Sequence, residues 1–364
     1  RRPVNKENVI KSGLVKEKDS DLILDYIDID LPESIITKNQ IMMLDILANN
    51  NWERPIYFTG GSYEESEYIW MKDYLQLDGL VYKLVPIKTS IENNPYEMGR
   101  IDSDLMYDIV KKWSWGNSES DEIYHDPETR KNSISFRGNL SRLSEKLISE
   151  GEYEKAEEIL DLAFSKMPID YYGYYSLWTP LVKSYYDIGK SEKVKEIVQK
   201  LSFKYSDRLS YFSSLEIFNQ YDVGEEIISD IERFRNLIET IQESGEREIL
   251  ADQIKSFISS SEQFNYIYGE YDYYISLSNF LVSLLELNEL EYSMSVIDKI
   301  EEQLIRRVSV FSNIDEDEQV YYLEGITSDI NQYSRLINQI EVYDIDAYNK
   351  YDKNLKDMLA RMIE

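Results

Sequence analysis

Only a few residues in this sequence of 364 have the type and surroundings that catalysis needs. His125 is the single histidine, so a Ser-His-Asp arrangement or an imidazole metal site would have to use it. Its neighbours are turn formers and charged residues, which favours a surface histidine without a catalytic partner. The sequence has no cysteine, which excludes disulfides, thiolate metal sites and cysteine nucleophiles.

Two other segments resemble ligand loops but lack the spacing that such loops need. Gly60-Gly61-Ser62 follows a predicted strand and opens a predicted helix, where an anion could bind. The glycine spacing is not that of a nucleotide-binding loop, which favours a plain turn. Residues 313–318 (NIDEDE) are rich in carboxylates but lack the glycine and the distant glutamate of a calcium loop, so we expect a solvated loop. No metal or other cofactor is expected, and no catalytic residue is assigned.

Aromatic residues are the best candidates for a binding surface. Tyrosine occurs 31 times, and its ring can stack on a sugar or a peptide while its hydroxyl forms a hydrogen bond. Packing between helices is the alternative use of the same rings, and it is favoured for the tyrosines and for the tryptophans. The candidate binding residues are Asn51, Trp52, Arg54, Tyr57, Trp113, Trp115, Tyr171, Tyr174 and Tyr175.

The charge of the chain restricts its partners. Asp and Glu number 69 and Lys and Arg number 40, which gives a formal net charge of −29. Such a charge repels a polyphosphate backbone and disfavours anionic lipid, so we expect no nucleic-acid partner. No apolar run approaches the roughly 18 to 20 residues of a membrane-spanning helix. Because the sequence starts at Arg1 without a signal peptide, we expect a fragment of a longer protein.

The N-terminal part predicts a small α/β domain. Residues 22–31 alternate apolar and acidic side chains like a half-buried strand, and a capping box of Thr37 and Gln40 begins a helix. Residues 55–59 and 80–87 predict two more strands, separated by a helix over about residues 64–76 that Asp78-Gly79 ends. The order βαβαβ predicts a parallel sheet with right-handed crossovers.

Residues 136–168 predict two helices joined by a tight turn, and they resemble one tetratricopeptide unit. Leu140, Leu143 and Leu147 form the apolar stripe of the first helix. Gly151 suits the left-handed conformation that ends a helix. Ala156 and Ala163 let the second helix approach closely, so both side chains are expected to be buried. A single pair of this kind cannot bury its apolar face alone, which predicts neighbouring units.

The pattern recurs further along the chain. Gly189 follows Gly151 by 38 residues, close to the 34-residue tetratricopeptide period. Weaker units surround Gly245 and Asn288, the latter with asparagine in place of glycine. The fold class is therefore α+β but mainly α, a small α/β domain followed by a tetratricopeptide-like array. The predicted boundaries are 1–20 (linker from a missing membrane domain), 21–92 (α/β domain), 93–135 (irregular connector with one short helix), 136–260 (repeats) and 261–364 (helical extension).

Four motifs carry a resemblance to a known family: NNNWERPIYFTGG, YLQLDGLVYKLVPIK, GRIDSDLMYD and SFRGNLSRLSEKLISEGEYEKA. Together they resemble the C-terminal soluble region of the bacterial domain-of-unknown-function 2723 family, whose relatives include the eukaryotic transmembrane protein O-mannosyltransferases. The resemblance covers about residues 40–205. It implies that a multi-spanning glycosyltransferase domain of the lipid-linked-donor type precedes a periplasmic or extracytoplasmic tail.

Two functions are compatible with these observations. The resemblance implies a non-catalytic tail that positions a protein or peptide acceptor for its own N-terminal membrane domain, while the full-length protein is the glycosyltransferase. The alternative is an independent carbohydrate-binding or glycoside-hydrolysing module. Hydrolysis would need two carboxylates about 5 to 10 Å apart, and with 69 acidic residues the sequence does not identify such a pair.

Overall fold

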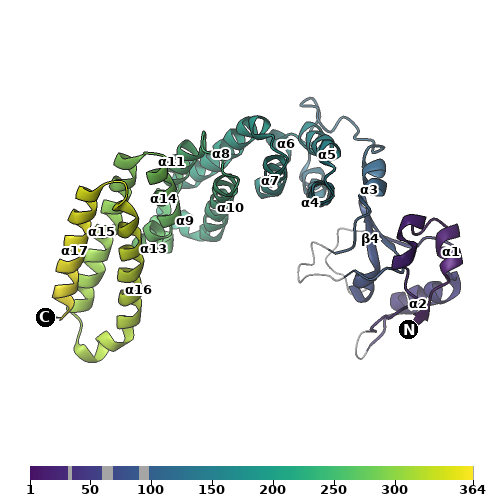
Figure 1. Ribbon diagram of the computed structural model, residues 1–364, viewed down its shortest axis with the longest axis horizontal. Helices are drawn as coiled ribbons and strands as arrows, with labels where there is room; N and C mark the ends of the chain where they lie inside the picture. The colour runs from purple at the N-terminus through teal and green to yellow at the C-terminus, as the bar shows by residue number, and fades with distance from the viewer. Residues whose placement is uncertain (32–34, 60–68, 90–97, 364) are drawn as a thin grey trace. The chain divides into compact units, whose positions relative to one another are not determined.

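The computed structural model describes residues 1–31, 35–59, 69–89 and 98–363, and the chain is mainly helical with small sheets near its N-terminus (Figure 1). It divides into two compact units, an N-terminal unit of residues 1–190 and a C-terminal unit of residues 191–364. The domain boundaries predicted from the sequence stay predictions. Within the described ranges, no helix is long and apolar enough to cross a membrane.

A two-stranded ribbon lies at the N-terminus. β1 (Arg2–Pro3) pairs antiparallel with β2 (Tyr26–Ile27), and α1 (Lys6–Lys11) and the 3-10 helix η1 (Glu17–Leu22) separate them in the sequence. The predicted strand over residues 22–31 is therefore wrong except at two central positions. Alternating apolar and acidic residues indicate that one side of a segment is buried. A strand, however, extends only as far as a neighbouring strand pairs with its backbone N–H and C=O groups. Because β1 has only two residues, β2 is equally short.

The second sheet is antiparallel, which corrects the prediction of a parallel βαβαβ domain. β5 (Val81–Leu84) lies between β3 (Tyr57–Thr59) and β4 (Leu75–Asp78), and both pairs run antiparallel. The two predicted strands at residues 55–59 and 80–87 do share one sheet. Gly60-Gly61-Ser62 lies outside the described residues.

The predicted helix over residues 64–76 is wrong where the structure describes it. Residues 64–68 lie outside the described ranges, Ile69–Tyr74 forms the 3-10 helix η3, and β4 follows at once. Asp78-Gly79 does not end a helix; it turns β4 into β5, with Gly79 at φ 74°. Asp-Gly between two apolar runs is a hairpin signal, because only glycine adopts positive φ without a steric penalty.

One ion pair is buried in this sheet. Lys83 Nζ lies 2.9 Å from Asp78 Oδ2, and both side chains are 4% exposed. Gln76 Nε2 donates a 2.8 Å hydrogen bond to the other carboxylate oxygen of Asp78. Removing one partner would leave the other charge buried and unpaired, so the three residues stabilise the sheet only as a set.

Helices lie before and after the irregular segment at residues 111–126: α2 (Lys38–Asn50) and α3 (Ser103–Val110) precede it in the sequence, and α4 (Pro127–Ser149) follows it. α2 begins with the predicted capping box of Thr37 and Gln40. The short helix predicted within the connector at residues 93–135 is α3. α4 begins nine residues before residue 136, because Asp126 accepts a hydrogen bond from the Thr129 backbone and Pro127 fits the first helical position.

The predicted helix pair at residues 136–168 is confirmed as a pair of packed helices. α4 is followed by α5 (Tyr153–Lys166), and the two helices pack against each other. Gly151 has φ 79°, and Glu152 N donates to Leu147 O, as in a Schellman turn. Ala156 and Ala163 are fully buried, as predicted. α6 (Ile169–Tyr172), η5 (Tyr175–Trp178) and α7 (Thr179–Asp187) complete the N-terminal unit.

The C-terminal unit consists of helices in its described residues 191–363. They are α8 (Ser191–Ser213), α9 (Ile217–Asp222), α10 (Gly224–Glu243), α11 (Leu250–Ser261), η6 (Glu262–Phe264), α12 (Asn265–Tyr268), α13 (Glu270–Ile275), α14 (Ser278–Glu286), α15 (Leu290–Ser312), α16 (Glu316–Ile340) and α17 (Ile345–Ile363). The loop predicted at residues 313–318 is wrong for its last three residues, which form the first turn of α16. Acidic side chains stabilise a helix N-terminus, which explains the helix there.

Residues with left-handed backbone conformation follow the helices whose ends the sequence predicts. Gly189 and Gly245 have positive φ, and Asn288 adopts φ 64° in the position that glycine holds elsewhere. Glu289 N donates a hydrogen bond to Leu284 O, just as Glu152 N donates to Leu147 O in the turn at Gly151. Asparagine tolerates this conformation better than other side chains, so the substitution keeps the turn.

Helices α15, α16 and α17 lie side by side at the C-terminus (Figure 1). Tyrosines hold them together: Tyr333 of α16 donates a 2.8 Å hydrogen bond to Glu301, and Tyr351 of α17 donates one of 2.8 Å to Asp298. Tyr271, Tyr273 and Tyr274 are also buried. These tyrosines are packing residues, the alternative that the sequence left open for the tyrosine clusters.

Candidate functional site

Residues 49–54, at the start of the motif NNNWERPIYFTGG, form a packed turn. Asn51 and Trp52 have φ of 45° and 62°, so two residues without the freedom of glycine reverse the chain after α2. Trp52 is 4% exposed, and its Nε1 donates a 3.1 Å hydrogen bond to Pro3 O. The Asn51 carbonyl accepts a hydrogen bond from Asn8. Trp52 is therefore held in the core.

Arg54 and Tyr57 differ from Trp52 because their side chains are exposed. The Arg54 backbone forms two hydrogen bonds with the side chain of Asn50, which fixes the turn and leaves the guanidinium in solvent. Tyr57 of β3 is 50% exposed. Partial burial and the negative charge of Asp78 raise the pKa of Tyr57, so its phenol stays protonated at neutral pH. Both side chains are open to a ligand.

Trp113 and Trp115 join a packed aromatic cluster. Their ring centroids are 5.5 Å apart, and Phe136 of α4 lies 5.2 Å from Trp113 and 5.6 Å from Trp115. A Cβ on Gly79 would come within 3.0 Å of Trp113, so the hairpin between β4 and β5 fits against this ring. The cluster connects the sheet to α4, as the packing interpretation expects.

Two polar residues of α4 strengthen the same connection. Asn139 Nδ2 donates to Gly79 O at 2.8 Å. Arg142 donates to the carbonyls of Met98 and Gly99 at 2.9 and 2.8 Å. Phe136, Asn139 and Arg142 come from the motif that opens the predicted repeat, so this motif positions α4 on the sheet domain.

Tyr171, Tyr174 and Tyr175 surround a turn that Arg137 holds. Arg137 is fully buried and donates to the carbonyls of Gly173 and Tyr174 at 2.8 and 3.3 Å. Tyr174 adopts φ 47° and is 48% exposed, whereas Tyr171 and Tyr175 are half-buried. The turn presents one tyrosine ring to solvent.

His125 lies beside this turn in a shallow hollow of about 450 Å³. Its ring stacks on Tyr171 with centroids 5.5 Å apart, and its Nε2 lies 3.1 Å from Ser120 O. Asp121, Glu122, Ile123 and the 81% exposed ring of Tyr124 also line the hollow. The histidine is thus a partly buried residue of a surface hollow.

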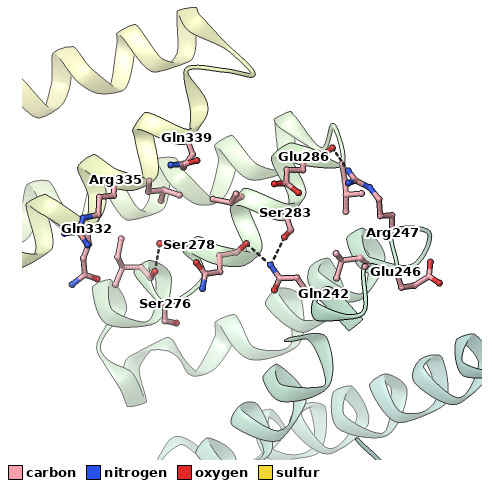
Figure 2. A pocket seen from close by; sticks show the side chains of 17 residues that line it. Gln242, Glu246, Arg247, Ser276, Ser278, Ser283, Glu286, Gln332, Arg335 and Gln339 are labelled. Atoms are coloured by element: carbon pink, nitrogen blue, oxygen red, sulfur yellow. Dashed lines mark hydrogen bonds between the residues drawn. The ribbon is translucent and has the colours of Figure 1, made fainter. Parts of the chain in front are cut away.

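A cavity larger than the His125 hollow lies in the C-terminal unit and was not predicted from the sequence. This groove has a volume of about 730 Å³, and its walls come from the end of α10, the loop before α11, the segment from Ile275 to Leu287 and one face of α16. Figure 2 shows Gln332, Arg335 and Gln339 of α16 on one side and Gln242 and Arg247 on the other. We call it the amide groove, because its polar lining includes Gln242, Asn279, Gln332 and Gln339.

Hydrogen bonds between its walls fix the floor of the amide groove. Gln242 Nε2 donates to Ser283 Oγ at 2.7 Å and to Asn279 O at 3.5 Å (Figure 2). Arg247 Nη2 donates to Glu286 O at 3.0 Å. The floor is therefore preorganised by contacts between α10, the following loop and α14.

The chemistry of the amide groove is that of recognition. Side-chain amides donate and accept hydrogen bonds, as the backbone of a polypeptide and the hydroxyls of a sugar do. Across the described residues, no cluster of three or more His, Cys, Asp or Glu side chains could hold a metal ion. The described lining of the groove therefore has the hydrogen-bonding groups that suit a polar ligand.

Sequence reasoning missed the amide groove because its walls are distant in the sequence. Gln242, Ser283 and Arg335 lie about 40 to 90 residues apart, and no local pattern connects them. The one available signal was the polar spacing of Gln332, Arg335 and Gln339, which places three long side chains on one face of a helix.

The fold and these sites define a mainly helical protein with a small antiparallel sheet domain at its N-terminus and a polar groove among its C-terminal helices. Residues 1–105, which include both sheets, match the family model described as TMEM260-associated domain 2. No curated protein and no solved structure matches the sequence. The matched segment ends within α3, before the helices that form the amide groove.

Proposed function

We propose that this chain is a non-catalytic, extracytoplasmic part of a membrane glycosyltransferase-like protein, and that its helices bind a polypeptide acceptor. The match of residues 1–105 to a TMEM260-associated domain supports the link to an O-mannosyltransferase. The helix pairs with left-handed turns at Gly151, Gly189 and Asn288 support a tetratricopeptide-like array. In this proposal the chemistry belongs to a membrane domain outside this sequence.

The amide groove is the observation that carries the proposal. An extended polypeptide needs partners for its backbone N–H and C=O groups, and the groove offers side-chain amides on opposite walls. Its volume of about 730 Å³ suits a few residues of an extended chain. The fixed floor lowers the entropy that binding would otherwise lose.

Carbohydrate binding is the second candidate, and the His125 hollow favours it. An exposed ring such as Tyr124 can stack on a sugar, and the carboxylates of Asp121 and Glu122 can accept hydrogen bonds from hydroxyl groups. The hollow is shallow and has fewer polar partners than the amide groove, so we place polypeptide binding first.

A parallel screen of the purified 364-residue chain separates the two functions. We expect a random peptide library to yield binders and an array of glycans to yield none. Asn279→Trp, which fills the amide groove with a ring, should abolish peptide binding. The matched control Asn349→Trp, on the exposed surface of α17, should leave it intact. Glycan binding that survives Asn279→Trp, without any peptide binding, would contradict the proposal.

A further inference from the structure

The amide groove continues along α16. A second hollow of about 740 Å³ is lined by residues of α16 alone, from Val320 to Arg335. It shares Gln332 and Arg335 with the amide groove, so one face of the helix borders both cavities. We call this second cavity the α16 hollow. A continuous lining on one helix points to an elongated ligand instead of a compact one.

The length of this helix face sets the length of the ligand. From Val320 to Gln339, an α-helix that rises about 1.5 Å per residue extends about 28 Å. An extended polypeptide advances about 3.4 Å per residue, so about eight residues cover the face. This length fits a short linear segment of a protein.

Arg335 lies where the two cavities meet. Its side chain is exposed and forms no hydrogen bond, ion pair or ring contact with any residue in the described ranges. Arg247, the other cation of the amide groove, already donates to the Glu286 carbonyl. The chain has a net charge of −29, so the positive groups that can attract an anion are outnumbered by acidic ones. The exposed, unpaired guanidinium of Arg335 can therefore attract one carboxylate of a ligand at this position.

The far end of the α16 hollow is apolar. Val320 is 72% exposed and Leu323 is 49% exposed, and both line the hollow. Glu324 lies about one helical turn from Val320, on the side of Arg335, so it disfavours a carboxylate close to the apolar end of the ligand. Along α16, Val320 and Arg335 are about 22 Å apart at the usual helical rise, which corresponds to about six extended residues.

We propose that the amide groove and the α16 hollow together bind an extended polypeptide segment of about eight residues. The segment carries a carboxylate opposite Arg335 and, about six residues away, an apolar side chain opposite Val320 and Leu323. This inference rests on the proposed function and adds the sequence features of the bound segment. The positive charge of Arg335 favours a ligand with a carboxylate, and the apolar side chains of Val320 and Leu323 favour a ligand with an apolar group at the other end.

A set of labelled octapeptides tests the inference by fluorescence anisotropy on the whole chain. Each peptide is acetylated and amidated and has a serine and glutamine background, with leucine near one end and aspartate six positions away, in both orders. We expect one order to bind about fivefold more tightly than its Asp→Asn counterpart, the effect of one partly exposed ion pair. Moving aspartate to about two positions from leucine should weaken binding, because Glu324 would repel it.

Variants of the chain assign the two ends. Arg335→Gln should bind the aspartate and asparagine peptides equally, whereas Arg306→Gln, which removes the same charge from the exposed surface of α15, should keep the difference. Val320→Ser should abolish the preference for leucine over serine, and Val310→Ser, at a similarly exposed valine on α15, should not. A preference for aspartate that persists in Arg335→Gln overturns the inference.

The outcomes also separate this inference from the proposed function. If all peptides bind equally and Asn279→Trp abolishes their binding, the groove is a polypeptide site and the sequence features are wrong. If neither these peptides nor the random library binds, both proposals fail. Circular dichroism of each variant confirms that it is folded, and the exposed positions of Arg335 and Val320 make this the expected result.

Discussion

The guanidinium of Arg137 lies 5.0 Å from the ring centroid of Trp178, and both side chains are fully buried. Arg137 also donates to Ser133 Oγ at 2.8 Å and to the Gly173 carbonyl at 2.8 Å. Burial lowers its pKa to about 10, which leaves it charged at neutral pH. One cation thus connects α4 to the turn that carries Tyr174 and to the start of α7.

Replacing this cation should destabilise the N-terminal unit. Arg137→Met keeps the apolar stem but leaves the carbonyls of Gly173 and Tyr174 without their donor, at a cost of about 1 to 3 kcal/mol. All five tryptophans lie in residues 1–190, so urea unfolding followed by tryptophan fluorescence reports on this unit. Lys131→Met, on the exposed face of α4, serves as the control. An unchanged midpoint for Arg137→Met would show that these hydrogen bonds contribute nothing.

Replacing two glycines of the α4–α5 pair by alanine, one at a time, should change the free energy of unfolding in opposite directions. Gly151 has φ 79°, where a Cβ is strained even without neighbours, so Gly151→Ala should cost about 1 kcal/mol. Gly138 lies inside α4 with open space around a new Cβ, so Gly138→Ala should stabilise by about 0.5 to 1 kcal/mol. The same fluorescence assay measures both, and equal signs for the two variants would contradict the turn assignment.

Ala156 tests the close packing of α4 on α5. Ala156→Leu places three extra carbons in a fully buried position and should cost about 1 to 3 kcal/mol. Ser165→Leu, on the exposed side of the same helix, should change the unfolding free energy by less than about 0.5 kcal/mol. If thermal unfolding of Ala156→Leu matches that of the parent, the two helices are not in close contact at this position.

The buried tyrosines make stability fall at alkaline pH. Burial, with the charge and the hydrogen bond of Glu301, raises the pKa of Tyr333 above its usual value. The folded chain therefore keeps a proton that the unfolded chain loses above about pH 10. The stabilisation is complete below pH 10 and decreases as the pH rises beyond it.

The variant Tyr333→Phe should reduce the slope of unfolding free energy against pH above about pH 10. It should also lower stability at neutral pH by about 1 kcal/mol, because Glu301 loses one hydrogen bond. Tyr321→Phe, at an 84% exposed position of the same helix, should leave the slope unchanged. Urea unfolding by circular dichroism at several pH values gives both slopes, and identical slopes for the two variants would contradict the burial of the Tyr333 phenol.

The helices could be predicted from the sequence because their signals are local. Gly151 and Asn288 take the left-handed conformation at helix ends, and Ala156 is buried on the face that its spacing defines. The sheet could not be predicted in the same way. Asp78-Gly79 can end a helix or form a hairpin, and the choice depended on the pairing of β4 with β5 and on Trp113 packing against Gly79.

The candidate site was less predictable than the fold. Trp52 and Trp113 have the residue type of a binding site, but one is in the core and the other packs on Gly79 and Phe136. Whether Arg54, Tyr57 and Tyr174 contact a ligand stays a prediction. The amide groove depends on helices that are distant in the sequence, and its glutamines look like ordinary surface residues until the helices are packed.

Cross-linking tests most directly whether the amide groove and the α16 hollow bind a polypeptide. The octapeptide that binds best is made with benzoylphenylalanine in place of leucine, irradiated with the 364-residue chain, and the labelled residues are located by mass spectrometry. We predict cross-links on α16 around Val320 and Leu323, which unlabelled peptide competes away and which Asn279→Trp reduces. Cross-links that concentrate in residues 1–190, or that do not depend on competition, would contradict polypeptide binding at this site.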